Sequence, residues 1–211
     1  MVTLTKEMRD FLSPNQALDL LKDGNHRFVT NLKVNRNLLQ QVNDTSDGQY
    51  PFAFILSCID SRTSAELIFD QGLGDIFSCR IAGNILNNDI LGSMEFACKV
   101  AGAKVVMVLG HSECGAIKGA CTHVKMGHLT GLLKKIRVVV KKLQKKYDDD
   151  LQSNNFLDLV TQENVKNVLK QIPKESKIIR DLIKNEKIIL VGAIYDISSG
   201  KVDFYETNQT K

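Results

Sequence analysis

The chain has 211 residues, of which 43% are hydrophobic and 25% charged, as in a globular protein with one sizeable core. Its 28 basic and 24 acidic residues leave a formal charge of +4, which does not call for a nucleic-acid partner. No segment approaches the ~18 apolar residues that a membrane span requires, so we expect no membrane partner either.

The N-terminal residues and the number of cysteines indicate in which cellular compartment the protein is located. The first residues, MVTLTKEMRDFLSP, lack the continuous apolar region of a secretory signal. Five cysteines are an odd number in a chain too large to need disulfides, which indicates reduced thiols or metal ligands. We expect a cytoplasmic protein, although a periplasmic protein whose leader had been removed would have the same sequence.

The first 50 residues are predicted to form a helical arm. Residues 13–29 have a helical pattern, with Ser13 as the N-cap and Pro14 in the first helical position. Residues 35–50 are polar and indicate an irregular arm or loop. We expect both segments to be too detached to bury themselves on a single copy of the chain.

Five apolar segments of strand length follow the arm. The predicted strands are residues 51–57, 75–81, 104–110, 187–195 and 201–206. The last follows its predecessor across a DISSG turn, so these two are predicted to pair antiparallel. The others are separated by helical patterns, which is typical of a mostly parallel sheet. We therefore expect an α/β fold with four parallel strands, an antiparallel C-terminal edge strand and flanking helices.

The predicted helices between these strands come from apolar residues at helical spacing. They cover residues 90–101, 130–147, 160–172 and 174–185, with the last two separated at Pro173. The lysines of the second helix are expected to form its solvent-exposed face. We find no interdomain linker or internal repeat. Residues 1–211 are predicted to be one domain, with 1–50 as the arm and 51–211 as the α/β core.

Chemically distinctive residues follow two of the predicted strands. Cys58, Asp60 and Arg62 follow residues 51–57, and His111 and Cys114 follow residues 104–110. Functional groups gather beyond the carboxyl ends of parallel strands, so we expect Cys58, His111 and Cys114 to meet. Two thiolates and one imidazole are a good ligand set for zinc. The other cysteines, Cys79, Cys98 and Cys121, are interpreted as buried thiols without a chemical role.

Asp60 and Arg62 could have any of several roles next to the metal ligands. Asp60 could be a fourth ligand, as in a structural site, or could accept a hydrogen bond from zinc-bound water in a catalytic site. Arg62 could hold the carboxylate with a bidentate pair. The two could also form a surface salt bridge of little consequence. No histidine is an obvious proton shuttle, since His26, His123 and His128 are interpreted as surface or helix-capping residues.

Three short segments carry a resemblance to a known family. CIDSR, RIAGN and GHSECGAI resemble the Cys-x-Asp-Ser-Arg, Arg-x-Ala-Gly/Ala-Asn and Gly-His-x-x-Cys-Gly motifs of the β-class carbonic anhydrases. ALDLLKDGNHRF, HLTGLL and VGAIYDISSGKV are also similar to the family, so the likeness covers nearly the whole chain. The resemblance implies one Zn²⁺ per chain, bound by Cys58, His111 and Cys114.

The activity implied by the resemblance is the reversible hydration of CO2 to bicarbonate and a proton. Zinc-bound hydroxide would attack CO2, with Asp60 and Arg62 as the dyad that orients the hydroxide. We also expect that Asp60, if released by Arg62, can displace the water and close the site as a fourth ligand.

The resemblance further implies substrate-binding residues and an oligomer. Gln49 matches a glutamine that reaches the active site across a dimer interface, and Phe77 and Ala82 match residues lining the CO2 slot. Gly115 follows the second cysteine ligand as expected. A homodimer or homotetramer with active sites at the dimer interface is therefore expected. Ile55 stands where one branch has a tryptophan, which favours the branch without an inhibitory bicarbonate pocket.

Other functions fit the sequence less well. A zinc-stabilised binding domain would have Asp60 as a permanent ligand and no activity. A thiol enzyme is disfavoured because neither Cys58 nor Cys114 begins a Cys-x5-Arg loop and no Cys-x-x-Cys pair exists. No phosphate-binding Gly-x4-Gly-Lys loop supports nucleotide binding. The same fold acting on carbonyl sulfide or carbon disulfide remains a rival interpretation.

Overall fold

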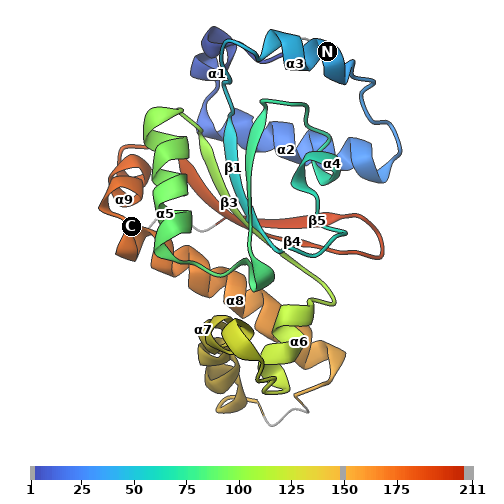
Figure 1. Cartoon of the computed structure of the whole chain (residues 1–211), viewed down its shortest axis with the longest axis vertical. Helices are drawn as coiled ribbons and strands as arrows, with labels where there is room; N and C mark the ends of the chain where they lie inside the picture. The colour runs from blue at the N-terminus through green and yellow to red at the C-terminus, as the bar shows by residue number, and fades with distance from the viewer. Residues whose placement is uncertain (1–2, 148–150, 207–211) are drawn as a thin grey trace.

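The computed structural model describes residues 3–147 and 151–206, and these form one five-stranded sheet with helices on both faces (Figure 1). The strands are β1 (Ala53–Ser57), β2 (Ile76–Arg80), β3 (Val105–His111), β4 (Ile189–Tyr195) and β5 (Val202–Glu206). Their order in the sheet is β2-β1-β3-β4-β5, and every pair is parallel except β4–β5. The predicted fold class is therefore confirmed.

The two central strands are apolar throughout because both of their faces are covered. In β1, Phe54 and Leu56 belong to one core cluster, whereas Ala53 and Ile55 belong to another on the opposite face. All residues of β1 and β3 are buried. The unbroken apolar segments in the sequence thus reflect a sheet buried between two helical layers.

The helices divide between the two faces and one end of the sheet. One face is covered by α5 (Asn88–Glu95), a π-helical turn η2 (Phe96–Val100), the C-terminal part of α8 (Asn154–Glu175) and α9 (Lys177–Lys184). The other face is covered by α2 (Pro14–Val29) and α4 (Ala65–Ile68). A third cluster joins α6 (Gly115–Cys121), α7 (Gly127–Gln144) and the start of α8.

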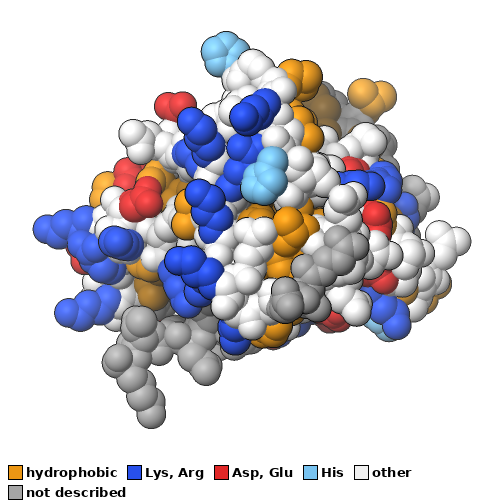
Figure 2. All heavy atoms as spheres, turned by 90° about the horizontal axis from the view of Figure 1, so that it is seen from below, with side chains coloured by type: hydrophobic (Ala, Val, Ile, Leu, Met, Phe, Trp, Pro, Cys, Tyr) orange, Lys and Arg blue, Asp and Glu red, His pale blue; other side chains and the backbone are white. Residues whose placement is uncertain are grey.

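The exposed face of α7 is strongly basic, as the sequence predicts. Its apolar residues Leu133, Ile136, Val139, Val140 and Leu143 are buried in the third cluster. Figure 2, which shows the molecule from the end where α6 and α7 lie, has Lys and Arg side chains gathered on this face. The lysines therefore form the solvent-exposed side of an amphipathic helix.

The expectation that the N-terminal helix is detached from the core is wrong. Helix α2 begins with a capping box in which Ser13 and Gln16 satisfy each other's backbone N–H groups. Its residues Ala17, Leu18 and Leu21 are fully buried against the sheet. Gly24 allows close approach, since a Cβ there would lie 1.8 Å from the Phe69 carbonyl oxygen. The apolar residues of α2, which recur at helical spacing, thus complete one face of the core.

Two further boundaries differ from the sequence predictions. Residues 38–44, expected to be irregular, form helix α3 (Leu38–Asp44), and Asn37 caps its N-terminus by accepting from the Gln40 N–H. Helix α8 also continues through Pro173 and ends at Glu175, and Ser176 then caps α9. A proline in the last turn removes only one hydrogen-bond donor, and the helix ends soon afterwards. A short helix, α1 (Lys6–Phe11), precedes α2.

Candidate metal centre

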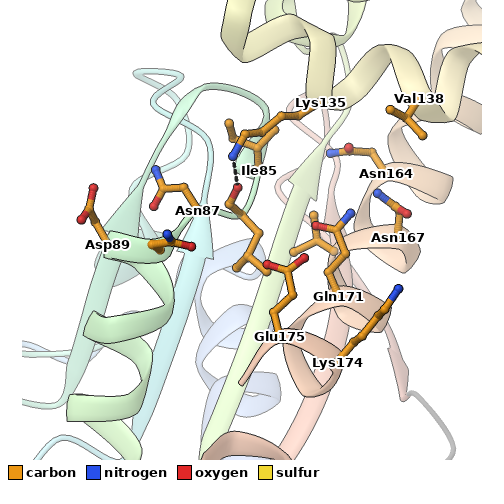
Figure 3. A pocket seen from close by; sticks show the side chains of 13 residues that line it. Ile85, Asn87, Asp89, Lys135, Val138, Asn164, Asn167, Gln171, Lys174 and Glu175 are labelled. Carbon is orange, nitrogen blue, oxygen red and sulfur yellow. Dashed lines mark hydrogen bonds between the residues drawn. The ribbon is translucent and has the colours of Figure 1, made fainter. Parts of the chain in front are cut away.

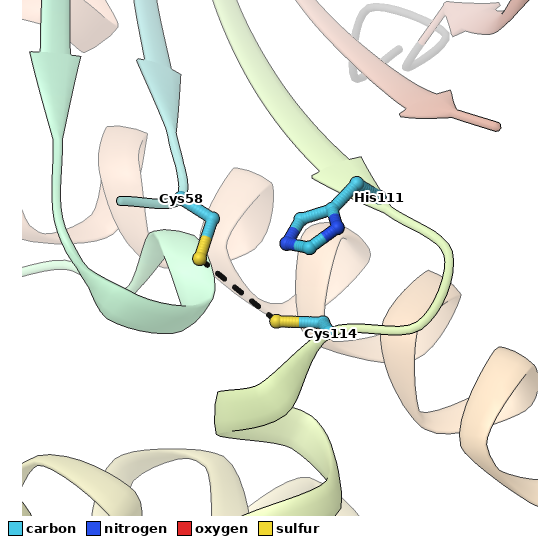
Figure 4. Close-up of side chains that lie close together, drawn as sticks. All are labelled: Cys58, His111 and Cys114. Carbon is cyan, nitrogen blue, oxygen red and sulfur yellow. Dashed lines mark hydrogen bonds between the residues drawn. The ribbon is translucent and has the colours of Figure 1, made fainter. Parts of the chain in front are cut away.

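The carboxyl ends of the two central strands place three potential metal ligands together. Cys58 directly follows β1, and His111 is the last residue of β3, which pairs with β1 along its length. Cys114 follows after a sharp turn in which Glu113 has a φ of 55°, and it is the N-cap of α6. Figure 4 shows the imidazole of His111 facing the sulfur atoms of Cys58 and Cys114.

The three side chains are close and almost completely buried. Their potential ligand atoms all lie within 4.8 Å of one another, and the two Sγ atoms are 3.9 Å apart. Cys58 is 4% exposed, His111 is 1% exposed and Cys114 is 5% exposed. The structure therefore brings together the three residues that the sequence predicts as ligands.

The histidine tests whether this set fits a metal ion. His111 Nδ1 lies 2.8 Å from the Ser112 carbonyl oxygen, which can only accept, so Nδ1 must carry the proton. Nε2 then presents a lone pair, yet it is buried and has no hydrogen-bond partner among the described residues. A neutral imidazole oriented by its other nitrogen is the usual form of a histidine ligand. The donor set fits zinc, which favours sulfur and nitrogen ligands.

The two thiols are electrostatically coupled. The hydrogen bond from Cys114 lowers the pKa of Cys58 to about 4, with smaller contributions from His111 and from the Gly83 N–H. The same bond, together with burial, raises the pKa of Cys114. One thiolate is thus formed readily beside one thiol. A divalent cation would favour the deprotonated form of both, because thiolates are the ligating species.

Asp60 and Arg62 form a bidentate ion pair next to the cluster. Arg62 Nε donates to Asp60 Oδ1 at 2.9 Å, and Arg62 Nη2 donates to Oδ2 at 2.8 Å. The backbone N–H of Arg62 also donates to Oδ1 at 2.9 Å. These bonds hold the pKa of Asp60 well below its usual range. Asp60 is outside the three-residue cluster and is held by Arg62 as an ionised acceptor.

A second arginine fixes the loop that carries Cys58 and Asp60. Arg80, at the end of β2, donates from Nε to the Cys58 carbonyl oxygen at 3.0 Å and from Nη2 to the Asp60 carbonyl. Thr63, only 1% exposed, donates to the same two carbonyls. No role for Arg80 or Thr63 is predicted from the sequence. Arg80 begins the RIAGN segment and Thr63 directly follows CIDSR, so both lie at recognisable motifs. Their contacts, however, form only when β1 and β2 pair in the sheet.

The residues predicted to bind substrate are distributed unevenly. Ala82 lies in the 3-10 turn η1 (Ala82–Asn84), next to the residue whose N–H reaches Cys58, and Gly115 begins α6 directly after Cys114. Phe77 pairs with Phe54 within the sheet. Gln49 is exposed and precedes the amino end of β1, opposite the end that carries Cys58. Within one chain the structure brings Ala82 and Gly115 to the site, but not Gln49.

The remaining cysteines and histidines lie outside the cluster. Cys98 and Cys121 are buried, and burial raises their pKa values to about 12 and about 11. Cys79 is half-buried, and burial raises its pKa as well. His26, His123 and His128 are exposed. These positions agree with the surface histidines and chemically inert thiols expected from the sequence.

Comparison with known proteins identifies the family. The family model described as carbonic anhydrase matches residues 53–202, which include all three members of the cluster. The chain is 34% identical over 196 residues to carbonic anhydrase 2 of Mycobacterium tuberculosis, covering 90% of this chain and 91% of that protein. The solved structure of the β-carbonic anhydrase CcaA is 27% identical, with a TM-score of 0.72, and the match covers 90% of this chain and 95% of that one.

The chain belongs to the β-class carbonic anhydrase family. A carbonic anhydrase of Mycolicibacterium smegmatis is 30% identical and matches 90% of this chain and 93% of its own length. A chain from the crystal structures of two tetrameric β-carbonic anhydrases of Sordaria macrospora shares the fold with a TM-score of 0.71 at 24% identity, and the match covers 75% of this chain and 82% of that one. The resemblance seen in the sequence is thereby confirmed, and the protein is an enzyme of this family. Among the described residues, no helix is both long and apolar enough to cross a membrane.

Proposed function

We propose that the protein catalyses the reversible hydration of CO2 to bicarbonate and a proton, with one zinc ion per chain held by Cys58, His111 and Cys114. The observation that carries this proposal is the buried Nε2 of His111, which lacks a partner among the described residues and faces two sulfur atoms. Three protein ligands leave a coordination position open, which is typical of catalytic zinc sites. When bound, zinc would supply Lewis-acid activation of water near neutral pH.

The role we propose for Asp60 is that of a hydrogen-bond acceptor. Arg62 donates two N–H groups to Oδ1 and one to Oδ2, so the ionised carboxylate has a further lone pair available on Oδ2. Because its pKa is held low, Asp60 stays ionised at neutral pH and does not take up the proton itself. It can therefore accept the O–H hydrogen of the reacting water and direct an oxygen lone pair toward CO2. Arg62 would fix the direction of the carboxylate.

We further propose that Phe77, Ala82 and Gly115 border the CO2 slot, and that Gln49 contributes from a second copy. The position of Gln49, beyond the amino end of β1, supports a contribution to a neighbouring chain rather than to its own site. Large apolar side chains are also exposed, including Phe11, which is 93% exposed, and Val100, which is 72% exposed. A homodimer that covers such residues fits this distribution.

We also propose a cytoplasmic location. All five cysteines are free, as they are in a reducing compartment. Oxidation of Cys58 or Cys114 would remove a proposed ligand, so a reducing environment suits this site.

A CO2-hydration assay with a pH indicator, on protein whose zinc content per chain is measured, tests the function. We expect about one zinc per chain and, for Asp60→Asn, a loss of activity of about 10²-fold or more with unchanged zinc content. Asp181→Asn, on the exposed surface of α9, is the matched control and should retain full activity.

Two other outcomes would contradict the proposal. Zinc-loaded protein without hydration activity would indicate a zinc-stabilised binding domain. Hydrolysis of carbonyl sulfide or carbon disulfide without CO2 hydration would indicate the rival substrate.

A further inference from the structure

Gly83 connects the proposed ligand Cys58 to the rest of the protein. Its backbone N–H donates to Cys58 Sγ at 3.3 Å. Its φ of 68° lies in the left-handed region, and a Cβ at this position would approach Ile136 Cδ1 to 2.5 Å. Both the conformation and the space therefore require glycine. An N–H group directed at a ligating sulfur tunes and orients that ligand.

The carbonyl of the same glycine is held by a side chain from a distant helix. Asn164 Nδ2, in α8, donates to the Gly83 oxygen at 2.9 Å. Asn164 is 2% exposed, and its helical neighbours Val160, Val165 and Val168 belong to the apolar core. Burying an amide among apolar residues is unfavourable unless the amide is hydrogen-bonded. The bond to Gly83 meets this requirement. With the bond from the Gly83 N–H to Cys58, both backbone polar groups of the glycine are then hydrogen-bonded.

We propose that Asn164 is a positioning residue for the metal centre, which acts by fixing Gly83 so that its N–H stays directed at Cys58 Sγ. The inference rests on the metal site of the proposed function. It adds a residue that lies outside the three-residue cluster and 106 positions after Cys58 in the sequence. Loss of the amide leaves the Gly83 carbonyl unpaired and allows the turn to rotate away from the sulfur.

The same region of the structure offers a matched control. Asn164 lines a cavity of about 810 Å³ between α5, α7 and α8, together with Asn167, Gln171 and Lys135, whose Nζ donates to the Leu86 carbonyl (Figure 3). Asn167 lies one turn further along α8 and is half-buried. It is an asparagine in the same helix and the same cavity, but it is not the donor to Gly83.

The test compares Asn164→Leu with Asn167→Leu in the zinc-loaded enzyme. Chelator competition measures zinc affinity, and the cobalt-exchanged protein reports the sulfur-to-metal charge-transfer band. For Asn164→Leu we expect zinc affinity to fall about ten-fold and the band to move to longer wavelength, because the thiolate loses a hydrogen bond. Asn167→Leu should match the wild type in both measurements. Asn164→Ser is the second variant, since its hydroxyl can bond within its own helix but replaces no amide at Gly83.

The outcomes separate this proposal from the proposed function. A wild-type protein that binds no zinc would contradict the metal site itself, and with it this inference. A zinc-binding wild type, together with Asn164 variants that have a lower Tm but unchanged affinity and band, would show a purely structural role and overturn the positioning proposal.

Discussion

At the scale of single residues, the most informative contact is the bidentate pair between Asp60 and Arg62. Two adjacent charges on an exposed loop often contribute little. Here the carboxylate of Asp60 is only 17% exposed, and Arg62 approaches it through three separate N–H groups. The arginine therefore does two things at once: it lowers the pKa of the carboxyl and it fixes the plane of the carboxylate.

Replacing Arg62 with alanine separates these effects from the metal. In Arg62→Ala the pKa of Asp60 should rise toward its ordinary value of about 3.9, because the first cause of its depression has been removed. We expect a ten- to hundred-fold lower kcat at neutral pH, since Asp60 remains ionised but loses its orientation. Carboxyl NMR shifts followed from pH 6 to pH 2 measure the first effect. An unchanged titration of Asp60 would contradict this account of the pair.

At the scale of elements, the 3-10 turn η1 packs closely against α7 beside the site. Gly83 has a positive φ, and its missing Cβ leaves room for Ile136 of α7. We predict that Gly83→Ala lowers the free energy of unfolding by about 2 kcal/mol or more, through backbone strain and the clash together. Urea unfolding measures this change. Gly131→Ala, in the middle of α7 with nothing near the added carbon, should instead stabilise the protein by about 0.5–1 kcal/mol.

The helices and strands differ in how well the sequence predicts them. Strands β1 and β3 could be predicted because they are buried on both faces and read as unbroken apolar segments. The three metal ligands could be predicted because the carboxyl ends of parallel strands lie at the same edge of the sheet. Helix α3 was not predicted because it has only seven residues and its apolar side chains, Leu38, Leu39 and Val42, are exposed instead of forming a buried stripe, although Asn37 was a usable cap signal. Asn164 could not be found, since its partner Gly83 lies 81 residues away and an isolated asparagine predicts nothing.

At the scale of the whole molecule, each active site in the proposed dimer would contain residues from two copies of the chain. Gln49 and Cys58 lie toward opposite ends of β1, so one copy of the chain does not bring them together. In a two-fold symmetric dimer each copy can supply its Gln49 to the site of the other.

Mixing two inactive variants tests this arrangement. Gln49→Ala should lower activity while zinc content is unchanged, and Cys58→Ser should lower both. In a hybrid dimer, the Cys58→Ser chain would supply an intact Gln49 to the intact metal site of the Gln49→Ala chain. Random reassociation of equal amounts gives hybrids in about half of the dimers, so about a quarter of wild-type activity should return. Activity that stays at the mean of the two separate variants would place Gln49 outside the partner's site.

The position of the metal ligands within the sheet has a consequence for how such a protein can diversify. Cys58 directly follows β1 and His111 ends β3; both strands are hydrogen-bonded on both sides, as is β4, whereas β2 and β5 form the margins. Substitutions, extensions or new contacts along β5 can accumulate without shifting the backbone of either ligand. The interior strands thus keep the metal ligands in place, while the edge strand β5 can tolerate sequence changes, whether they arise in evolution or by protein engineering.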